Sequence, residues 1–140
     1  MRENRILYFV YQLYKWLMFM PVVAVSMVFF SLLAIVLSIC VSPEAGYWSG
    51  ILWTKLVCWS TPVRCNVQGL GHLDKSKSYV LVSNHQSYYD VTLLVGFLPL
   101  NLKWVMKMEL RKVPFFGYAC EKGGHIFVDR SNRATALASM

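Results

Sequence analysis

The sequence lacks the cysteine spacing that disulfide and zinc frameworks need. Its four cysteines, Cys40, Cys58, Cys65 and Cys120, form no C-x-x-C pair, and Cys40 lies inside a long apolar run. We therefore expect reduced, structural thiols. Internal repeats and low-complexity segments are also absent, which excludes repeat architectures.

Charge is missing from a long stretch near the N-terminus. No residue between Lys15 and Glu44 is charged, and residues 16–41 are almost wholly apolar. As a helix this run would measure about 39 Å, more than the roughly 30 Å of bilayer hydrocarbon, so tilt or a bend at Pro21 would absorb the excess. A cleaved signal peptide is the competing interpretation, but the run is too long for one. We predict a retained membrane segment.

Acidic residues are scarce, with 7 Asp and Glu against 14 Lys and Arg and a net charge of +7. Arg2, Arg5 and Lys15 precede the apolar run, which favours a cytoplasmic N-terminus. A single crossing would place the rest of the chain outside, whereas a hairpin near Pro21 or a helix in one leaflet would keep both ends cytoplasmic. The excess of positive charge is explained by a solvated surface or by attraction to anionic lipid head groups. The absence of a basic stripe argues against nucleic-acid binding.

The chain is predicted to begin with membrane-associated helices. Part of an α/β domain follows, with a mainly parallel sheet and flanking helices. We divide the chain into residues 1–61, with an interfacial Trp-rich helix at 46–60 ended by Pro62, and residues 62–140. Strands are expected over 63–67, 79–83 (buried on both faces), 102–106 and 125–129. Helices are expected over 88–98 and 131–140, with a helix and turn at 109–124 broken by Pro114 and Gly117. The sheet looks incomplete at residue 140.

The stretch SNHQSYYD, residues 83–90, combines a helix start with two reactive side chains. Ser87 and Asp90 form a capping-box pattern, S-x-x-D, in which His85 would be an ordinary loop residue. If the chain turns a corner here, the Asp90 carboxylate can also reach one nitrogen of His85, leaving the other as a general base. A G-x-S-x-G elbow is absent and no cysteine lies nearby, so the nucleophile would belong to the substrate.

Two basic stretches complete the candidate site. In GGHIFVDR, residues 123–130, Arg130 is either an anion-binding residue after a strand or a surface residue paired with Asp129, and His125 is interpreted as structural. Residues 103–117 predict a basic face near the membrane, in which Lys107 is a candidate phosphate contact. That face comprises Lys103, Lys107, Arg111 and Lys112, set against Glu109.

The three stretches NHQSYYD, KMELRKVPFFG and GGHIFVDR occur in an order that resembles successive motifs of the glycerolipid acyltransferases. The resemblance covers about residues 63–135 and is strongest to the bacterial 1-acyl-sn-glycerol-3-phosphate acyltransferases. It implies acyl transfer from acyl-CoA or acyl carrier protein to the sn-2 hydroxyl of lysophosphatidic acid, giving phosphatidic acid without a metal. It also implies a bacterial inner-membrane protein whose active site faces the cytoplasm.

The resemblance further assigns a role to each candidate residue. His85 would deprotonate the acceptor hydroxyl, Asp90 would orient His85, and Arg130 would bind the acceptor phosphate. Lys107 matches a family position near the site.

The sequence departs from the family in lacking its third motif, Phe-Pro-Glu-Gly-Thr-Arg, and its fourth. We therefore expect either a fragment or a degenerate copy of such an enzyme, with little or no activity unaided. The alternatives are an acyltransferase for glycerol-3-phosphate or another lysophospholipid, and a non-catalytic membrane-binding protein that uses its aromatic and basic surfaces.

Overall fold

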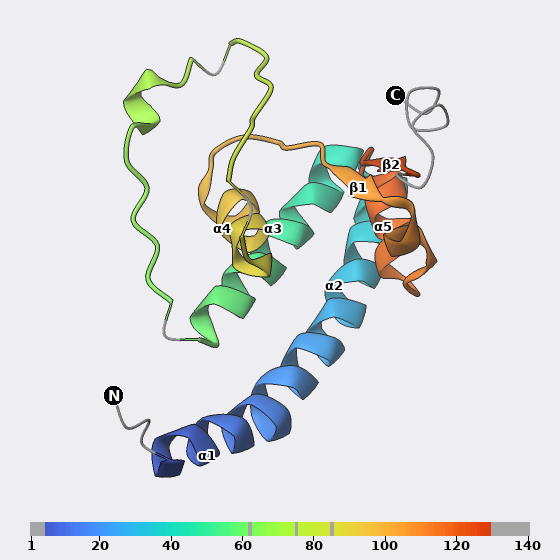
Figure 1. Cartoon of the computed structure of the whole chain (residues 1–140). Coiled ribbons are helices and arrows are strands. Elements are labelled where there is room, and N and C mark those ends of the chain that lie inside the picture. Colours follow the sequence, from blue (N-terminus) through green and yellow to red (C-terminus); the bar gives the residue numbers. More distant parts are fainter. Residues whose placement is uncertain (1–4, 62, 75, 85, 130–140) are drawn as a thin grey trace.

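The computed structural model describes residues 5–61, 63–74, 76–84 and 86–129. A bent N-terminal helix leads into a second helix folded back along it, and a long irregular segment then connects to a small α/β part (Figure 1). The mixed α/β class is therefore confirmed.

The N-terminal helix runs without a break through α1 (Arg5–Tyr14), the π-helical turn η1 (Lys15–Phe19) and α2 (Met20–Cys40). Figure 1 shows it curving between α1 and α2. Pro21 has no N–H to donate into the preceding turn and its ring crowds the carbonyl there, which explains a π-turn and a bend at this place. The apolar helix predicted over 16–41 is confirmed and begins earlier, at Arg5.

Within the described chain, Arg5–Cys40 is the one helix long and apolar enough to cross a membrane. Its most apolar 18-residue window has a mean hydropathy of 2.8. The surface of α1 carries exposed Ile, Leu, Tyr, Phe and Val side chains on all sides. These features support membrane association of the N-terminal part of the chain.

Helix α3 (Pro43–Trp59) folds back along α2 and begins with strong local signals. Ser42 is its N-cap, with a hydroxyl that accepts from the Ala45 N–H at 3.2 Å, and Pro43 occupies the first turn. Ser49 Oγ donates to the Phe30 carbonyl at 2.7 Å. The helix predicted over 46–60 is confirmed; it begins earlier, at Pro43, and ends at Trp59. Pro62, expected to end it, lies outside the described residues.

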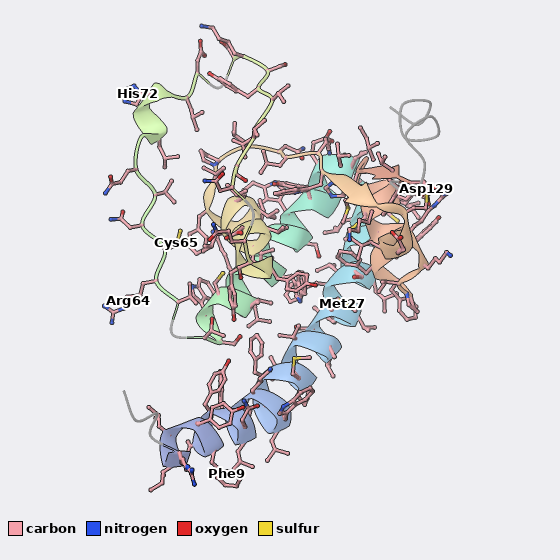
Figure 2. All side chains as sticks on the ribbon, viewed as in Figure 1. Phe9, Met27, Arg64, Cys65, His72 and Asp129 are labelled. Carbon is pink, nitrogen blue, oxygen red and sulfur yellow. The ribbon has the colours of Figure 1, made fainter. Side chains whose placement is uncertain are left out.

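The strands predicted over 63–67 and 79–83 are wrong. Both segments are irregular, apart from the 3₁₀ turn η2 (Leu70–His72) between them, and Val80 and Val82 are 94% and 90% exposed rather than buried. Figure 2 shows Arg64, Cys65 and His72 spaced along this segment, to the left of the helices in this view. A β-prone sequence becomes a strand only when a neighbouring strand takes up its N–H and C=O groups, and none among the described residues does so here.

The α/β part begins with α4 (Tyr88–Phe97), whose C-cap is Leu98. The helix predicted over 88–98, ahead of Pro99, is therefore confirmed to within one residue. Two short strands follow, β1 (Val105–Lys107) and β2 (Ile126–Val128), which pair in parallel with Val105 opposite Ile126. Between them lie the 3₁₀ helix η3 (Met108–Lys112) and α5 (Phe116–Lys122). The predicted parallel order is confirmed over this stretch, and the helix expected over 131–140 lies outside the described residues.

Gly117 lies inside α5 and does not break it, contrary to the prediction. A Cβ at this position would collide with the Arg111 carbonyl oxygen and would lie 2.6 Å from the carbonyl carbon. Glycine is therefore required because η3 and α5 approach each other backbone to backbone. The division of the chain into two domains at residue 62 stays a prediction. Helix α3, which belongs to the first predicted domain, packs against α4 and α5 of the second as well as against α2.

Candidate functional site

The N-terminus of α4 carries a complete capping box built from Ser87 and Asp90. The Ser87 hydroxyl accepts from the Tyr89 N–H at 3.2 Å, and the Ser87 N–H donates to Asp90 Oδ2 at 2.8 Å. These bonds satisfy backbone donors that a helix leaves without intrahelical partners. The predicted capping role of Ser87 and Asp90 is confirmed.

Asp90 also holds the chain that leads into α4. The Gln86 N–H donates to the same oxygen, Oδ2, at 2.7 Å, so the carboxylate reaches four residues back along the chain. The backbone therefore turns a corner here, as predicted, although the segment before the corner is not a strand. His85 lies outside the described residues, and its neighbour in the sequence, Gln86, is bonded to Asp90.

Helix α4 is positioned by α3, along which it runs antiparallel. Cys58 Sγ lies 3.6 Å from Thr92 Oγ1 near the start of α4, and Thr54 lies against Gly96 near its end. The side chains of Thr54 and Cys58 are both buried in this contact. The corner at residues 86–90 therefore lies near the C-terminal end of α3.

Lys107 occupies the last position of β1 and is exposed. It pairs with Val128, the last residue of β2, because the two strands are parallel and in register. The carboxyl ends of parallel strands meet at one edge of a sheet, so Lys107 and the chain after Val128 share that edge. Arg130 follows Val128 by two positions in the sequence and lies outside the described residues.

The structure does not bring Asp90 and Lys107 into one described cluster. Helix α4 lies beside α3, whereas β1 and β2 lie near the N-terminal end of α3 (Figure 1). In Figure 2, Asp129 appears directly after β2, on the opposite side of the helices from Arg64 and Cys65.

Two members of the predicted basic face bind other groups of the protein. Lys103 Nζ donates to the Gly123 carbonyl at 2.8 Å and lies 5.9 Å from the centre of the Tyr47 ring. Arg111 forms two bonds to Glu121, at 3.1 and 2.8 Å, rather than a pair with Glu109. All four cations of this face, Lys103, Lys107, Arg111 and Lys112, are nevertheless exposed.

His125 is structural, as predicted. Its Nδ1 accepts the Trp104 N–H at 3.0 Å and so joins the residues that precede β1 and β2. Burial, together with the nearby charge of Lys103, lowers the pKa of His125 from 6.5 to about 4. The imidazole is therefore neutral at pH 7, with its proton on Nε2.

We expect acidic pH to weaken the hydrogen bond between the Trp104 N–H and His125. The folded-state pKa of His125 lies below the ordinary value of 6.5. The neutral imidazole therefore contributes its full stabilisation of the fold above pH 6.5, and this stabilisation is lost as the pH falls towards 4. The shift corresponds to about 3 kcal/mol at most, reduced by the partial exposure of the ring. Exchange of the Trp104 amide hydrogen, corrected for its intrinsic pH dependence, should accelerate over this range. His125→Gln should abolish that pH dependence, and the exposed-site control His72→Gln should keep it; equal behaviour of the two variants would contradict the assignment.

The four cysteines are free thiols, in agreement with the sequence interpretation. Burial raises the pKa of Cys120 to about 12, so this thiol stays protonated and is a poor nucleophile. Within the residues that the structure describes, no three His, Cys, Asp or Glu side chains converge in a way that could hold a metal ion.

Comparison with known proteins places the chain among acyltransferases. Residues 64–140, more than half of the chain, match the family described as Acyltransferase. A "1-acyl-sn-glycerol-3-phosphate acyltransferase" of Helicobacter pylori is 33% identical over 76 residues, which cover 54% of this chain and 32% of that protein. The Pseudomonas aeruginosa protein of the same name is 37% identical over 92 residues, covering 63% of this chain and 35% of the relative.

A mammalian relative shows the same partial coverage. The human "1-acyl-sn-glycerol-3-phosphate acyltransferase alpha" is 37% identical over 78 residues, covering 56% of this chain and 28% of that protein. The aligned part of the chain thus spans about a third of the length of these curated relatives. No solved structure matches the chain.

Proposed function

The chain belongs to the acyltransferase family, and from this membership we propose that it carries the reaction-centre part of a lysophosphatidic acid acyltransferase. The observation that carries the proposal is that relatives from bacteria and mammals, matched over about half of this chain, are named as 1-acyl-sn-glycerol-3-phosphate acyltransferases. The reaction transfers a fatty acyl group from a thioester to the sn-2 hydroxyl of lysophosphatidic acid and yields phosphatidic acid.

His85 is the general base of the proposed mechanism. It takes the proton of the acceptor hydroxyl as that oxygen attacks the thioester carbonyl carbon. The carbon–sulfur bond then breaks, the new ester bond remains, and the imidazolium returns its proton to the leaving thiolate. Base assistance of this kind is worth about 10²- to 10⁴-fold, and holding the two substrates together supplies more. No enzyme-bound acyl group is needed.

Asp90 is proposed to orient His85 while it caps α4. A carboxylate has two oxygens with about four acceptor positions, so the two bonds that Oδ2 accepts are compatible with a further bond to an imidazole. The negative charge would also stabilise the imidazolium that forms during the reaction. The support in the structure is the corner at residues 86–90, where the residue next to His85 is bonded to Asp90.

Arg130 and Lys107 are proposed to bind the phosphate of the acceptor. A guanidinium can bind two phosphate oxygens at once, and an exposed ammonium adds a point charge. The support is the parallel register, which pairs Lys107 with Val128 at the edge of the sheet that Arg130 follows in the sequence.

The donor is proposed to be acyl-CoA or acyl carrier protein, with no metal required. The proposed location is the bacterial inner membrane, with the reaction centre on the cytoplasmic side. The supporting features are the apolar helix Arg5–Cys40 and the bacterial relatives.

A transfer assay tests the proposal. Labelled acyl-CoA and acyl carrier protein would be offered with lysophosphatidic acid, glycerol-3-phosphate or another lysophospholipid, in membranes carrying this chain. A second version would take the remaining length from the Pseudomonas aeruginosa relative. We expect lysophosphatidic acid to be the preferred acceptor in the second version. A preference for glycerol-3-phosphate would replace the proposed acceptor, and no transfer to any acceptor would refute the enzymatic proposal.

A further inference from the structure

The turn between η3 and α5 holds a bulky residue in a strained backbone conformation. Phe115 has a φ of 62° and a ψ of −49°, and it is the one residue other than glycine with a positive φ in the described part of the chain. The Phe116 N–H donates to the Pro114 carbonyl at 2.7 Å, which closes a three-residue γ-turn of the rare, strained form. Glycine would adopt this conformation without strain, so the presence of a phenylalanine ring needs a separate explanation.

Phe115 and Phe116 have different surroundings although they are adjacent in the sequence. The centre of the Phe116 ring lies 6.5 Å from that of Trp53, so Phe116 packs α5 against α3. Phe115 remains 47% exposed, and its carbonyl accepts from the Ala119 N–H at 2.9 Å, which ties the strained residue to the first turn of α5. The turn therefore keeps the Phe115 ring at the surface while its neighbour anchors the helix.

The residues that flank Phe115 in the sequence add a second ring and two positive charges. Tyr118, three residues further on, is also 47% exposed, and Lys122 Nζ lies 5.2 Å from the centre of its ring. Lys112, at the end of η3, is exposed as well, as is Lys122. We call Lys112, Phe115, Tyr118 and Lys122 the turn surface.

The turn surface belongs to a helix that packs on α2. Helices α2 and α5 are in contact, and Figure 1 shows α5 beside the C-terminal half of α2. Helix α2 is part of Arg5–Cys40, the segment that is long and apolar enough to cross a membrane. Aromatic rings favour the head-group layer of a bilayer, and lysines near that layer are attracted to anionic lipids. The turn surface therefore has both the chemistry and the location of a membrane contact.

We propose that the turn surface is a second membrane contact, in which Phe115 and Tyr118 insert into the head-group layer of an anionic bilayer and Lys112 and Lys122 bind lipid phosphates. The proposal does not depend on the acyl-transfer reaction. An anionic bilayer is preferred to a protein partner because the turn surface carries positive charge and lies on a helix packed against the membrane-associated helix. A solvated surface would not explain why a strained turn holds an aromatic ring in water, where its exposure is unfavourable.

Spin labelling in vesicles tests the contact. A nitroxide would be attached at Tyr118→Cys, in a protein whose more accessible cysteines, Cys40 and Cys65, are replaced by serine. Collisions with oxygen and with a water-soluble nickel chelate report whether the label lies in the bilayer or in water. We expect the label to be shielded from nickel in vesicles of phosphatidylcholine and phosphatidylglycerol, and less so in phosphatidylcholine alone. A label at Lys77→Cys, in the exposed segment after α3, should be equally accessible in both.

The two lysines should account for the preference for anionic lipid. Lys112→Gln and Lys122→Gln should each lower the ratio of bilayer-bound to water-exposed label about fivefold in anionic vesicles, the usual contribution of one lysine near such a surface. Both should have little effect in phosphatidylcholine alone. Lys77→Gln is the matched control and should change neither ratio. An unchanged ratio after the loss of both Lys112 and Lys122 would contradict the proposal.

The two adjacent phenylalanines separate membrane contact from stability. Phe115→Gly should lower the same ratio about three- to tenfold, because it removes a ring whose exposed half would be buried in the bilayer. It should leave the melting temperature unchanged or raised, since glycine adopts a positive φ without strain. Phe116→Leu, which weakens the contact with Trp53, should lower the melting temperature and keep the ratio. The reverse pattern would show that Phe115 is structural and would overturn the proposal.

Two further results of the labelling experiment would also overturn the proposal. Equal exposure of the Tyr118→Cys label to nickel in both kinds of vesicle would identify the turn surface as solvated. Spin–spin broadening between labels, independent of the lipid composition, would identify it as a contact between two copies of the chain. None of these measurements uses acyl transfer, so failure of the proposed reaction would leave the membrane contact standing.

Discussion

His85→Ala is expected to lower acyl transfer to lysophosphatidic acid by about 10²- to 10⁴-fold, the usual contribution of a general base. Alanine cannot accept the hydroxyl proton, and neither Cys58 nor Cys120 can replace it, because both thiols are buried. Initial rates would be measured at saturating substrates in the version with the remaining length supplied. Membrane attachment should be unchanged. Full activity without His85 would end the proposed mechanism.

Two further variants separate the helix-capping role of Asp90 from its proposed catalytic role. Asn at position 90 keeps an oxygen that can accept from the Gln86 and Ser87 N–H groups, but it has no charge to stabilise an imidazolium. Asp90→Asn should therefore lower kcat by at least about 10²-fold with a modest loss of stability. Ser87→Ala removes the other half of the capping box and should cost about 1 kcal/mol of stability while kcat is kept. If both variants lose activity in proportion to stability, Asp90 is only a cap.

Gly46→Ala is expected to destabilise the α2–α3 hairpin by about 1–3 kcal/mol, the usual cost of overpacking. A Cβ on Gly46 would lie 2.8 Å from the Ala34 carbonyl oxygen and closer still to Ser38 Oγ. The first contact is with backbone, so relief requires the helices to separate. Thermal unfolding followed by circular dichroism in detergent would measure the loss.

Gly50 supplies a matched control one turn along α3, where an added Cβ would have no atom within 4 Å. Gly50→Ala should stabilise the protein by about 0.5–1 kcal/mol, because alanine favours the helix. Ser38→Ala should be neutral or stabilising, since the Ser38 hydroxyl is buried without a hydrogen-bond partner in the described structure. Combined with Gly46→Ala it should recover part of the loss. Similar effects of Gly46→Ala and Gly50→Ala would contradict the close packing.

The sequence by itself determined the features that depend on neighbouring residues. The charge-free run predicts the long apolar helix, because transfer of apolar side chains from water does not depend on a distant partner. The pattern of Ser87 and Asp90 predicts the start of α4, because a capping box closes its hydrogen bonds within four residues. One feature beyond neighbouring residues was also predicted, because the strand–helix–strand order of the chain implies the parallel pairing of β1 with β2.

Only the tertiary structure decided which segments and side chains find partners far along the chain. Residues 79–83 have the composition of a buried strand, yet a strand forms only where another takes up its backbone groups, and composition does not supply that partner. Arg111 pairs with Glu121 rather than Glu109, and Gly117 packs against the backbone of η3, because α5 folds back on η3. The apolar groove between α2 and α3, lined by residues such as Phe29 and Leu56, likewise depends on where two helices diverge. An apolar residue has the same sequence signature whether it lines a groove or faces lipid.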